Sequence, residues 1–383
     1  MTASSLALSS SPVRPVRVQA FVLRSPIETP VQTSFGIMYD RPALFVRVED
    51  ADGTQGWGEV WCNFPSCGAE HRARLVDTVL APLLTAQPFA DPKQAFDHLT
   101  QRTAVLALQS GEPGPFAQCI AGLDLALWDL CARRAGLPLW RYLGGTSDEV
   151  EVYASGLNPT APERVVEQRR SEGYRAFKLK IGFGQDRDIG NLATLRQLLG
   201  ADAPLMVDAN QAWDLAQALR MAPLLAQFGL GWLEEPLRCD RPWSEWQQLA
   251  AACSVPLAAG ENVMGPESFA LAVGSGALRV LQPDLAKWGG LSGCWPVVEW
   301  ARAAGLRYCP HYLGGGIGLL ASAHVLAAQG GEGMLEVDAN PNPLRTELAQ
   351  VFSAPVEGRC RLGDAPGIGR LPDVEALARS LAR

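Results

Sequence analysis

The sequence predicts an α/β protein: a (β/α)7-8 TIM-type barrel with an N-terminal α+β capping domain, completed by the C-terminal tail. The first observation is a repeat. Seven ionisable residues each end a short apolar or β-branched run and follow one another at intervals of 23 to 28 residues. Strands of such a barrel all end at one rim, so polar residues at their ends converge on one cavity. The seven are Lys180, Asp208, Glu234, Glu261, Asp284, His311 and Glu336.

The second observation is the different pattern in the first third of the chain. Apolar and polar residues alternate in VRVQAFVLR, PALFVRVED and GTQGWGEVW, and ADG at 51–53 signals a tight turn between the last two. Such alternation is typical of an antiparallel meander. Helical periodicity follows over 69–84, 92–107 and 115–135. These elements together predict the α+β capping domain.

Domain boundaries follow from these changes of pattern. We expect a disordered tail at 1–12, the capping domain at 13–140 and the barrel at 141–344, with eight strands between 151 and 337. The segment 345–383 is too short for a domain, and we expect it to pack back on the capping domain.

Two segments of the capping domain, 33–41 and 61–68, read as loops rich in Phe, Tyr, Trp, Cys and Gly. Their apolar character predicts a lid over the rim of the barrel. Candidates for contacting a substrate are the lid residues Tyr39, Arg41 and Asn63, and Asn210 from the barrel.

Composition excludes several classes of protein. With 383 residues, 48% hydrophobic and 19% charged, the chain can bury a large core. A net charge of −7 without Lys and Arg clusters argues against a nucleic-acid partner. Neither a long apolar run nor a secretion signal is seen, so we expect no membrane association and a cytoplasmic location. Nine cysteines without CxxC spacing favour reduced thiols over disulfides or zinc.

Three acidic residues at consecutive strand ends predict a metal site: Asp208 in VDAN, Glu234 in LEEP and Glu261 in GEN. A lone acidic residue would be read as a surface salt-bridge partner. Three buried carboxylates are costly without a cation, and all-oxygen ligands favour Mg²⁺ over zinc. Glu235 is adjacent to Glu234 and could be the ligand instead. Neighbouring side chains on a strand point to opposite faces, so only one of the two should face the cavity.

The pair Lys178 and Lys180 predicts a general base. Their i, i+2 spacing places both ammonium groups on one face of a strand. Two like charges close to each other and to Mg²⁺ favour loss of a proton, which makes a lysine basic enough to act. A solvated pair on an edge strand is the simpler alternative for a lone KxK motif.

A second acid–base group is predicted at the next strand ends. Asp284 beside His311 would fix the imidazole tautomer and support its charged form, although a lone histidine is more often structural. Glu336 could hydrogen-bond a substrate oxygen if it stays protonated. The glycines of 314–318 suggest either a phosphate cradle or close backbone approach.

In this order, these residues resemble the enolase superfamily, specifically its mandelate racemase-like branch. The resemblance covers nearly the whole chain and includes AGLDLALWDLCARRAGLPLWRYLGG, GENVMGPE and PDLAKWGG. The muconate-lactonising branch would have a lysine in place of Asp284 and no histidine at 311, and Lys287 lies three residues too late to replace it. The resemblance implies an enolase-like fold.

The resemblance also implies roles for the residues. Asp208, Glu234 and Glu261 would bind Mg²⁺, Lys180 would transfer a proton on one face of the substrate with support from Lys178, and the His311–Asp284 dyad would serve the other face. Glu336 would contact the enolate oxygen.

The implied reaction removes the proton next to a carboxylate to give an enediolate. We expect this to be followed by dehydration of a hydroxy acid such as an acid sugar, with racemisation or epimerisation as the alternative. A noncatalytic barrel that binds a carboxylate is the alternative from another class. The expected partner is a small-molecule carboxylate, and we expect a homo-oligomer.

Overall fold

The capping domain and the barrel are both present in the computed structural model, which describes residues 12–371, 373 and 374. The tail expected at 1–12 therefore lies, apart from Pro12, outside the described residues. Within the described part of the chain, no helix is long and apolar enough to cross a membrane.

The capping domain begins with the predicted antiparallel meander of β1 (Pro15–Gln32), β2 (Ile37–Asp50) and β3 (Gln55–Val60). Its second turn lies at 51–53, as predicted, with Gly53 at a φ of 82°. The lid segment predicted as a loop over 33–41 is shorter, because β2 begins at Ile37 and pairs with β1 as far as Gln32. Strand pairing thus extends almost to the tip of the hairpin.

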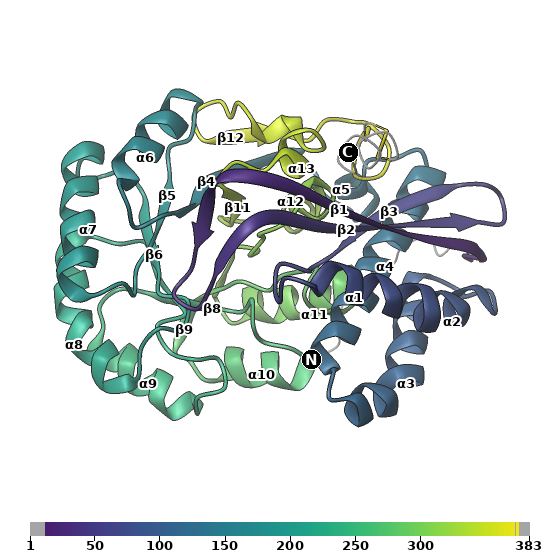
Figure 1. Cartoon of the computed structure of the whole chain (residues 1–383), viewed down its shortest axis with the longest axis horizontal. Helices are drawn as coiled ribbons and strands as arrows, with labels where there is room; N and C mark the ends of the chain where they lie inside the picture. The colour runs from purple at the N-terminus through teal and green to yellow at the C-terminus, as the bar shows by residue number, and fades with distance from the viewer. Residues whose placement is uncertain (1–11, 372, 375–383) are drawn as a thin grey trace.

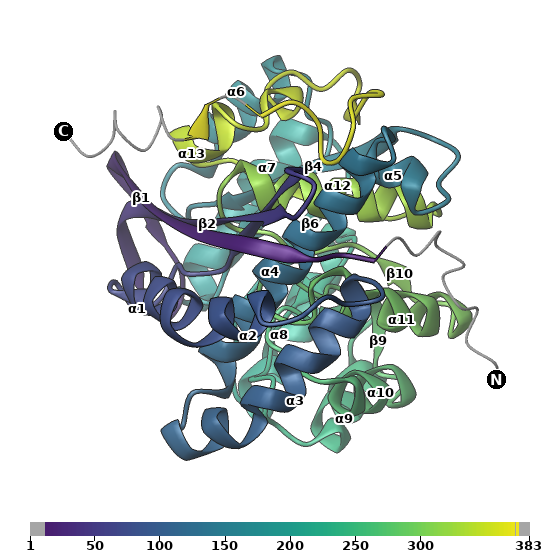
Figure 2. The ribbon, with the colours of Figure 1, turned by 90° about the vertical axis from the view of Figure 1, so that its right-hand side faces the viewer.

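The predicted helical stretches of the capping domain are all helical. The first is divided into α1 (Gly68–Leu75), a π-helical segment η1 (Val76–Leu80) and α2 (Ala81–Thr85). Figure 2 shows α1, α2 and α3 together on one side of the sheet. The two long helices are α3 (Pro92–Ser110) and α4 (Pro113–Arg134).

Helix α4 is almost entirely buried, because it packs closely against β3. A Cβ atom on Gly58 of β3 would lie 2.0 Å from the Gly122 carbonyl oxygen of α4, so only glycine fits there. This close packing is what attaches the long helix to the sheet of the capping domain.

The barrel has the eight predicted strands, all parallel. Neighbours are paired from β10 through β4 to β11, and the gap between β10 and β11 is crossed by the Met334 amide, which lies 3.4 Å from Cys309 Sγ. The strands are β4 (Glu149–Leu157), β5 (Phe177–Lys180), β6 (Leu205–Asp208), β7 (Leu233–Glu234), β8 (Leu257–Ala259), β9 (Leu278–Leu281), β10 (Arg307–Tyr308) and β11 (Met334–Asp338).

Helices surround the strands on the outside (Figure 1). Their apolar faces and the outward side chains of the strands form the main hydrophobic core. The helices are α5 (Leu139–Tyr142), α6 (Pro162–Ser171), α7 (Gln185–Leu199), α8 (Leu215–Leu225) with η2 (Ala226–Phe228), α9 (Trp243–Ala252), α10 (Pro266–Gly274), α11 (Gly290–Ala303), α12 (Gly316–Gln329), α13 (Pro343–Thr346) and η3 (Gln350–Phe352).

The described part of the C-terminal segment contacts both domains. Strand β12 (Arg359–Arg361) pairs antiparallel with β4 of the barrel. Further along, the Gly367 amide donates to the Leu137 carbonyl, and the Ile368 amide donates to Asp129 Oδ1 on α4 at 2.7 Å. The segment therefore ties the first barrel strand to the end of the capping domain.

The hairpin of β1 and β2 crosses from the capping domain to the rim of the barrel (Figure 1). At its tip, Ser34 Oγ donates to the Asn210 carbonyl at 2.8 Å. The second lid segment is attached too, because the Trp61 amide donates to the Ala286 carbonyl at 3.3 Å and Asn63 Nδ2 to the Leu313 carbonyl at 2.6 Å. Both segments thus lie over the rim at which the strands end.

Candidate active site

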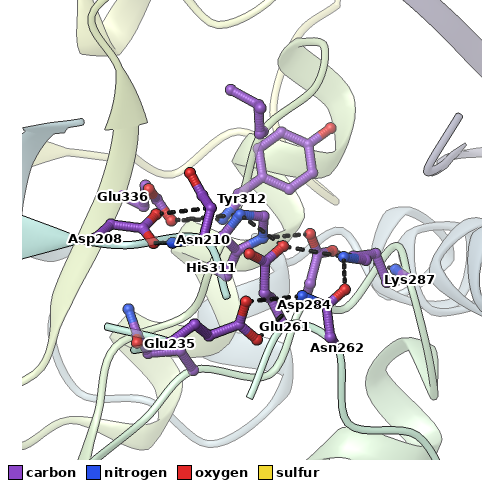
Figure 3. A network of polar contacts seen from close by, with 12 residues as sticks. Asp208, Asn210, Glu235, Glu261, Asn262, Asp284, Lys287, His311, Tyr312 and Glu336 are labelled. Carbon is purple, nitrogen blue, oxygen red and sulfur yellow. Dashed lines mark hydrogen bonds and ion pairs between the residues drawn. The ribbon is translucent and has the colours of Figure 1, made fainter. Parts of the chain in front are cut away.

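The seven strand-end residues lie together at one rim of the barrel. Lys180, Asp208 and Glu234 are the last residues of β5, β6 and β7, whereas Glu336 lies within β11. The other three lie two or three residues after the ends of β8, β9 and β10, and all seven side chains are buried. Figure 3 shows one continuous network of polar contacts through Asp208, Glu336, His311, Asp284 and Glu261. The repeat in the sequence therefore predicts the convergence correctly.

Each of the three predicted metal ligands contacts a different lysine. Lys180 Nζ lies 2.5 Å from Asp208 Oδ2, and Lys178 Nζ lies 2.6 Å from Glu234 Oε2. Glu261 Oε2 accepts from Lys287 at 2.9 Å. In the described part of the chain, no three His, Cys, Asp or Glu side chains converge closely enough to hold an ion as they stand.

The chemistry of these residues nevertheless fits a hard divalent cation. The three carboxylates come from adjacent strands and offer only oxygen. Glu234 Oε1 and Asn210 Oδ1 are buried without a hydrogen-bond partner, which is costly unless something else satisfies them. Burial raises the pKa of Glu234 to about 7, with Asp208 and Glu336 adding to the rise and Lys178 opposing it. A bound dication would lower the free-energy cost of burying these carboxylates.

The alternative ligand Glu235 lies in a different environment from Glu234. Its backbone has a φ of 39°, and both carboxylate oxygens accept from Asn262 Nδ2, at 3.0 and 2.9 Å. Burial and the nearby charge of Glu261 raise its pKa well above the usual range. Glu234 contacts Lys178 and Glu235 contacts Asn262, so the two neighbours have different partners; Glu235 lies just beyond the end of β7.

The lysine pair lies on one face of β5, as predicted, and its charges are paired rather than solvated. Lys178 Nζ also lies 2.7 Å from Glu336 Oε1 and 5.4 Å from the centre of the Tyr153 ring. The pKa of Lys180 is raised in this structure, whereas the expected loss of a proton included a nearby Mg²⁺. Burial, the largest single cause, and the charge of Lys178 lower it, but the carboxylates of Asp208, Glu234 and Glu336 together outweigh both.

The predicted dyad is formed: His311 Nδ1 lies 2.7 Å from Asp284 Oδ2. On the other side of the ring, Nε2 lies 3.3 Å from Glu261 Oε2. Burial alone would lower the pKa of His311, but Glu261, Glu336 and Asp284 outweigh it and raise the pKa to about 9. The imidazole is therefore charged at neutral pH in this structure.

Glu336 is ionised here, so the expectation of a protonated acid is not met. Burial raises its pKa, but the charges of Lys178, His311 and Lys180 outweigh burial and lower it. Ser155 Oγ donates to Oε1 and the Tyr312 amide donates to Oε2 at 3.2 Å. The carboxylate therefore accepts hydrogen bonds, and it has no proton of its own to donate.

A cavity of about 210 Å³ lies between the network and the two lid segments. Both predicted proton-transfer residues, Lys180 and His311, line it, together with the substrate-contact candidates Asn63 and Asn210. The further lining residues are Thr33, Phe35, Trp61, Phe64, Gln211, Glu261, Asn262, Lys287 and Leu313.

The other two substrate-contact candidates lie away from this cavity. Tyr39 is on β2 and 71% exposed. Arg41 is buried, with Nη2 2.6 Å from Asp338 Oδ2, so its guanidinium joins the capping domain to β11. Both residues belong to β2, which begins earlier than expected, whereas Phe35, in the short turn before β2, lines the cavity.

Sequence reasoning missed two buried charged residues near the site, Lys287 and Glu59. Lys287 follows β9 and lines the cavity; its position in PDLAKWGG, three residues after Asp284, is the signal that could have identified it. Glu59 lies on β3 and accepts from the amides of Gly315 at 2.5 Å and Gly318 at 2.8 Å. No pattern in the sequence links Glu59 to those glycines.

Glu59 explains the glycine run, which serves close backbone approach rather than a phosphate. A Cβ atom on Gly315 would lie 2.8 Å from the Phe45 ring and 2.9 Å from Glu59 Oε1. The amides at the start of α12, which could bind an anion, already bind this carboxylate. The capping domain thus supplies an internal carboxyl group to the barrel.

Glu59→Gln should remove part of the pH dependence of folding stability. Burial raises the pKa of Glu59 to about 7, although the two amides lower it. The folded state then holds a proton that the unfolded state loses above its pKa of about 4.5, so stability falls as pH rises between these values. Urea denaturation should show the wild type losing about 3 kcal/mol relative to Glu59→Gln across that window. If the free energy of unfolding changed with pH in the same way for both proteins, this account would be contradicted.

Two family models match the chain. Residues 17–144 match the mandelate racemase / muconate lactonizing enzyme N-terminal domain, and residues 161–376 match the enolase C-terminal domain-like model. The first match covers the capping domain and the second covers most of the barrel.

Individual proteins match over nearly the whole length. A D-galactarolactone cycloisomerase from Agrobacterium fabrum is 31% identical, over 92% of this chain and 94% of the relative. A solved structure of a mandelate racemase/muconate lactonizing enzyme from Bordetella bronchiseptica is 60% identical, with a TM-score of 0.92, over 97% of this chain and 100% of the other. A racemase from Streptomyces coelicolor, solved with bound magnesium, is 30% identical, with a TM-score of 0.85, over 95% and 99%.

Relatives of this chain include sugar-acid dehydratases, cycloisomerases and racemases, all of them enzymes. The expected resemblance and fold are therefore confirmed, whereas the relatives differ in the reaction they catalyse. The chain is a member of the mandelate racemase/muconate lactonizing enzyme family of the enolase superfamily.

Proposed function

We propose that this protein removes the proton next to the carboxylate of a hydroxy acid, such as an acid sugar, and then eliminates the β-hydroxyl as water. The observation that carries the proposal is that Lys180 and His311 line the same cavity from strands on different sides of the buried carboxylates. One can accept a proton from carbon while the other donates a proton to the leaving oxygen.

Asp208, Glu234 and Glu261 would hold Mg²⁺ at this cavity. Bound there, the ion would supply positive charge that stabilises the substrate carboxylate as negative charge builds on it. The fit rests on the oxygen-only ligands and on the unpartnered oxygen of Glu234.

The chain's own groups would then divide the work of proton transfer. With Asp208 engaged by Mg²⁺, the carboxylate that does most to raise the pKa of Lys180 would no longer hold its proton, and Lys180 as a neutral amine would accept the proton from carbon. Lys178 beside it adds positive charge where the substrate becomes negative. Asp284 holds Nδ1 of His311 and supports the charged imidazole, so Nε2 would carry the proton to donate. With that proton the β-hydroxyl leaves as water, whereas without it the leaving group would be hydroxide ion, which leaves much less readily.

Racemisation is the second candidate, and the same pair of groups favours it. If His311 returned a proton to carbon rather than to oxygen, the configuration would invert. A noncatalytic carboxylate-binding barrel is the candidate from another class, but binding alone requires neither Lys180 nor the dyad.

Proton NMR in D₂O with Mg²⁺ tests the proposal on a set of acid sugars and 2-hydroxy acids. A 2-keto product formed with loss of water supports dehydration. Deuterium uptake at the α-carbon without loss of water supports racemisation instead. Binding of an acid with neither deuterium uptake nor product would support the noncatalytic carboxylate-binding barrel.

His311→Asn should separate the two proton transfers. Asparagine removes the acid but keeps a polar side chain, so product formation should fall by roughly 10²- to 10⁴-fold. Exchange of the α-proton for deuterium should continue, because Lys180 is unchanged. The measurement is NMR of substrate and product in the same reaction. Equal loss of exchange and product would show that His311 is not the acid.

A further inference from the structure

Lys287 is a buried cation in the cavity that the proposed proton transfers do not use. It lies between β9 and α11, and its Nζ donates to Glu261 Oε2 at 2.9 Å and to Asn262 Oδ1 at 2.7 Å. The ammonium also lies 4.7 Å from the centre of the Trp61 ring, on the second lid segment. Barrel and capping domain together therefore fix its position.

This cation lies at the opposite end of the network from the lysine pair. Figure 3 shows Lys287 at one edge, beside Glu261 and Asn262, and Asp208 with Glu336 at the other. A substrate whose reacting carboxylate lies near Lys180 would therefore extend toward Lys287, where Trp61 and Asn63 complete the lining. The end of the molecule remote from the reacting carbon would meet a positive charge.

The charge of Lys287 is balanced in this structure by a carboxylate that Mg²⁺ binding would engage. Glu261 neutralises it here at 2.9 Å. A dication on Glu261 would claim most of that negative charge and leave the buried ammonium with only the weaker interactions of Asp284 and Glu235, which is costly. The nearby carboxylate of Glu235 is already held on both oxygens by Asn262. An ammonium has three donors, and Glu261 and Asn262 account for two.

We propose that Lys287 binds a second carboxylate of the substrate, at the end remote from the reacting carbon. The inference rests on the proposed function and narrows its substrate class to dicarboxylic hydroxy acids. A charge-assisted hydrogen bond to a carboxylate is about twice as strong as a neutral one, so a terminal hydroxyl in the same place would bind more weakly.

The test compares matched pairs of ligands, each a diacid and a monoacid that differ only at the remote end. None of them has a β-hydroxyl to lose as water. These are 2-hydroxyglutarate and 2,5-dihydroxypentanoate, with the six-carbon pair 2-hydroxyadipate and 2,6-dihydroxyhexanoate in case the cavity is longer. Titration calorimetry with saturating Mg²⁺ should show the wild-type protein binding one or both diacids roughly 10- to 100-fold more tightly than the matched monoacid.

Lys287→Met should reduce that preference to less than about threefold, and Lys287→Arg should retain most of it, because arginine also binds carboxylates. Circular dichroism and Mg²⁺ titration establish that each variant is folded and binds the ion. A wild type without preference for either diacid would overturn the proposal. So would a Lys287→Met variant that weakens diacid and monoacid equally, because Lys287 would then act only through Glu261. Failure of the proposed function is a separate result, since it appears as absent α-proton exchange whatever the remote group.

Discussion

Lys180→Met should lower kcat by roughly 10²- to 10⁴-fold, the range that a positioned general base contributes. Methionine has nearly the length of lysine but no amine, so the variant removes proton transfer with little change in packing. Asp208 loses a contact of 2.5 Å but still accepts from the amide and the side chain of Asn210, at 2.8 and 3.1 Å. The fold should therefore survive the substitution.

The measurement is kcat together with deuterium uptake at the α-carbon, and both should fall in parallel. Lys180→Arg is the matched control, because arginine keeps the positive charge beside Asp208 but stays protonated at any pH of interest. If charge alone mattered, Lys180→Arg would restore activity. Exchange at the wild-type rate in Lys180→Met would show that another group removes the proton.

The main architecture could be predicted because it depends on patterns that repeat along the chain. Strand ends at a constant interval identify the rim, and Asp208, Glu261 and His311 lie on it as expected. The alternation of the first third predicts the meander, and ADG marks its turn. In each case the local sequence is enough, because the residues that set the element lie within it.

Interactions between distant segments could not be predicted in the same way. Arg41 was expected in a lid, but it lies on a strand that pairs further than its composition indicates, and it meets Asp338 from the barrel. The run of glycines at 314–318 has its explanation in Glu59, more than 250 residues away along the chain. A single sequence carries no signal for either contact.

The pKa of Lys180 shows a further limit of sequence reasoning. The KxK spacing correctly predicts that the two ammonium groups share one face and that the charge of Lys178 lowers the pKa of Lys180. Their effect is outweighed by carboxylates whose distances depend on the closed barrel, Asp208 above all. The sign of a pKa shift in a dense network depends on such distances, so it requires the structure.

Removal of divalent metal by EDTA should abolish turnover, and added Mg²⁺ should restore it, without unfolding the chain. In this structure Lys178, Lys180 and Lys287 each bind one of the acidic residues, so the metal-free fold has its buried charges paired. The same pairing leaves Lys180 bound to Asp208 and the substrate carboxylate without its stabilising charge. Chelation should therefore stop the reaction while circular dichroism stays unchanged.

Mg²⁺ binding can also be measured apart from activity. At a free concentration 100 times its Kd, an ion that binds only the folded state should raise the free energy of unfolding by about 2.7 kcal/mol. Asp208→Asn should remove most of this gain, because it takes a full negative charge from the ligand set while keeping the size of the side chain. Urea denaturation with EDTA and with Mg²⁺ gives the gain for both proteins. Wild-type activity that withstands chelation, or an equal gain in Asp208→Asn, would mean that these three carboxylates do not hold the ion. Their burial on adjacent strands would then be explained by their lysine partners alone.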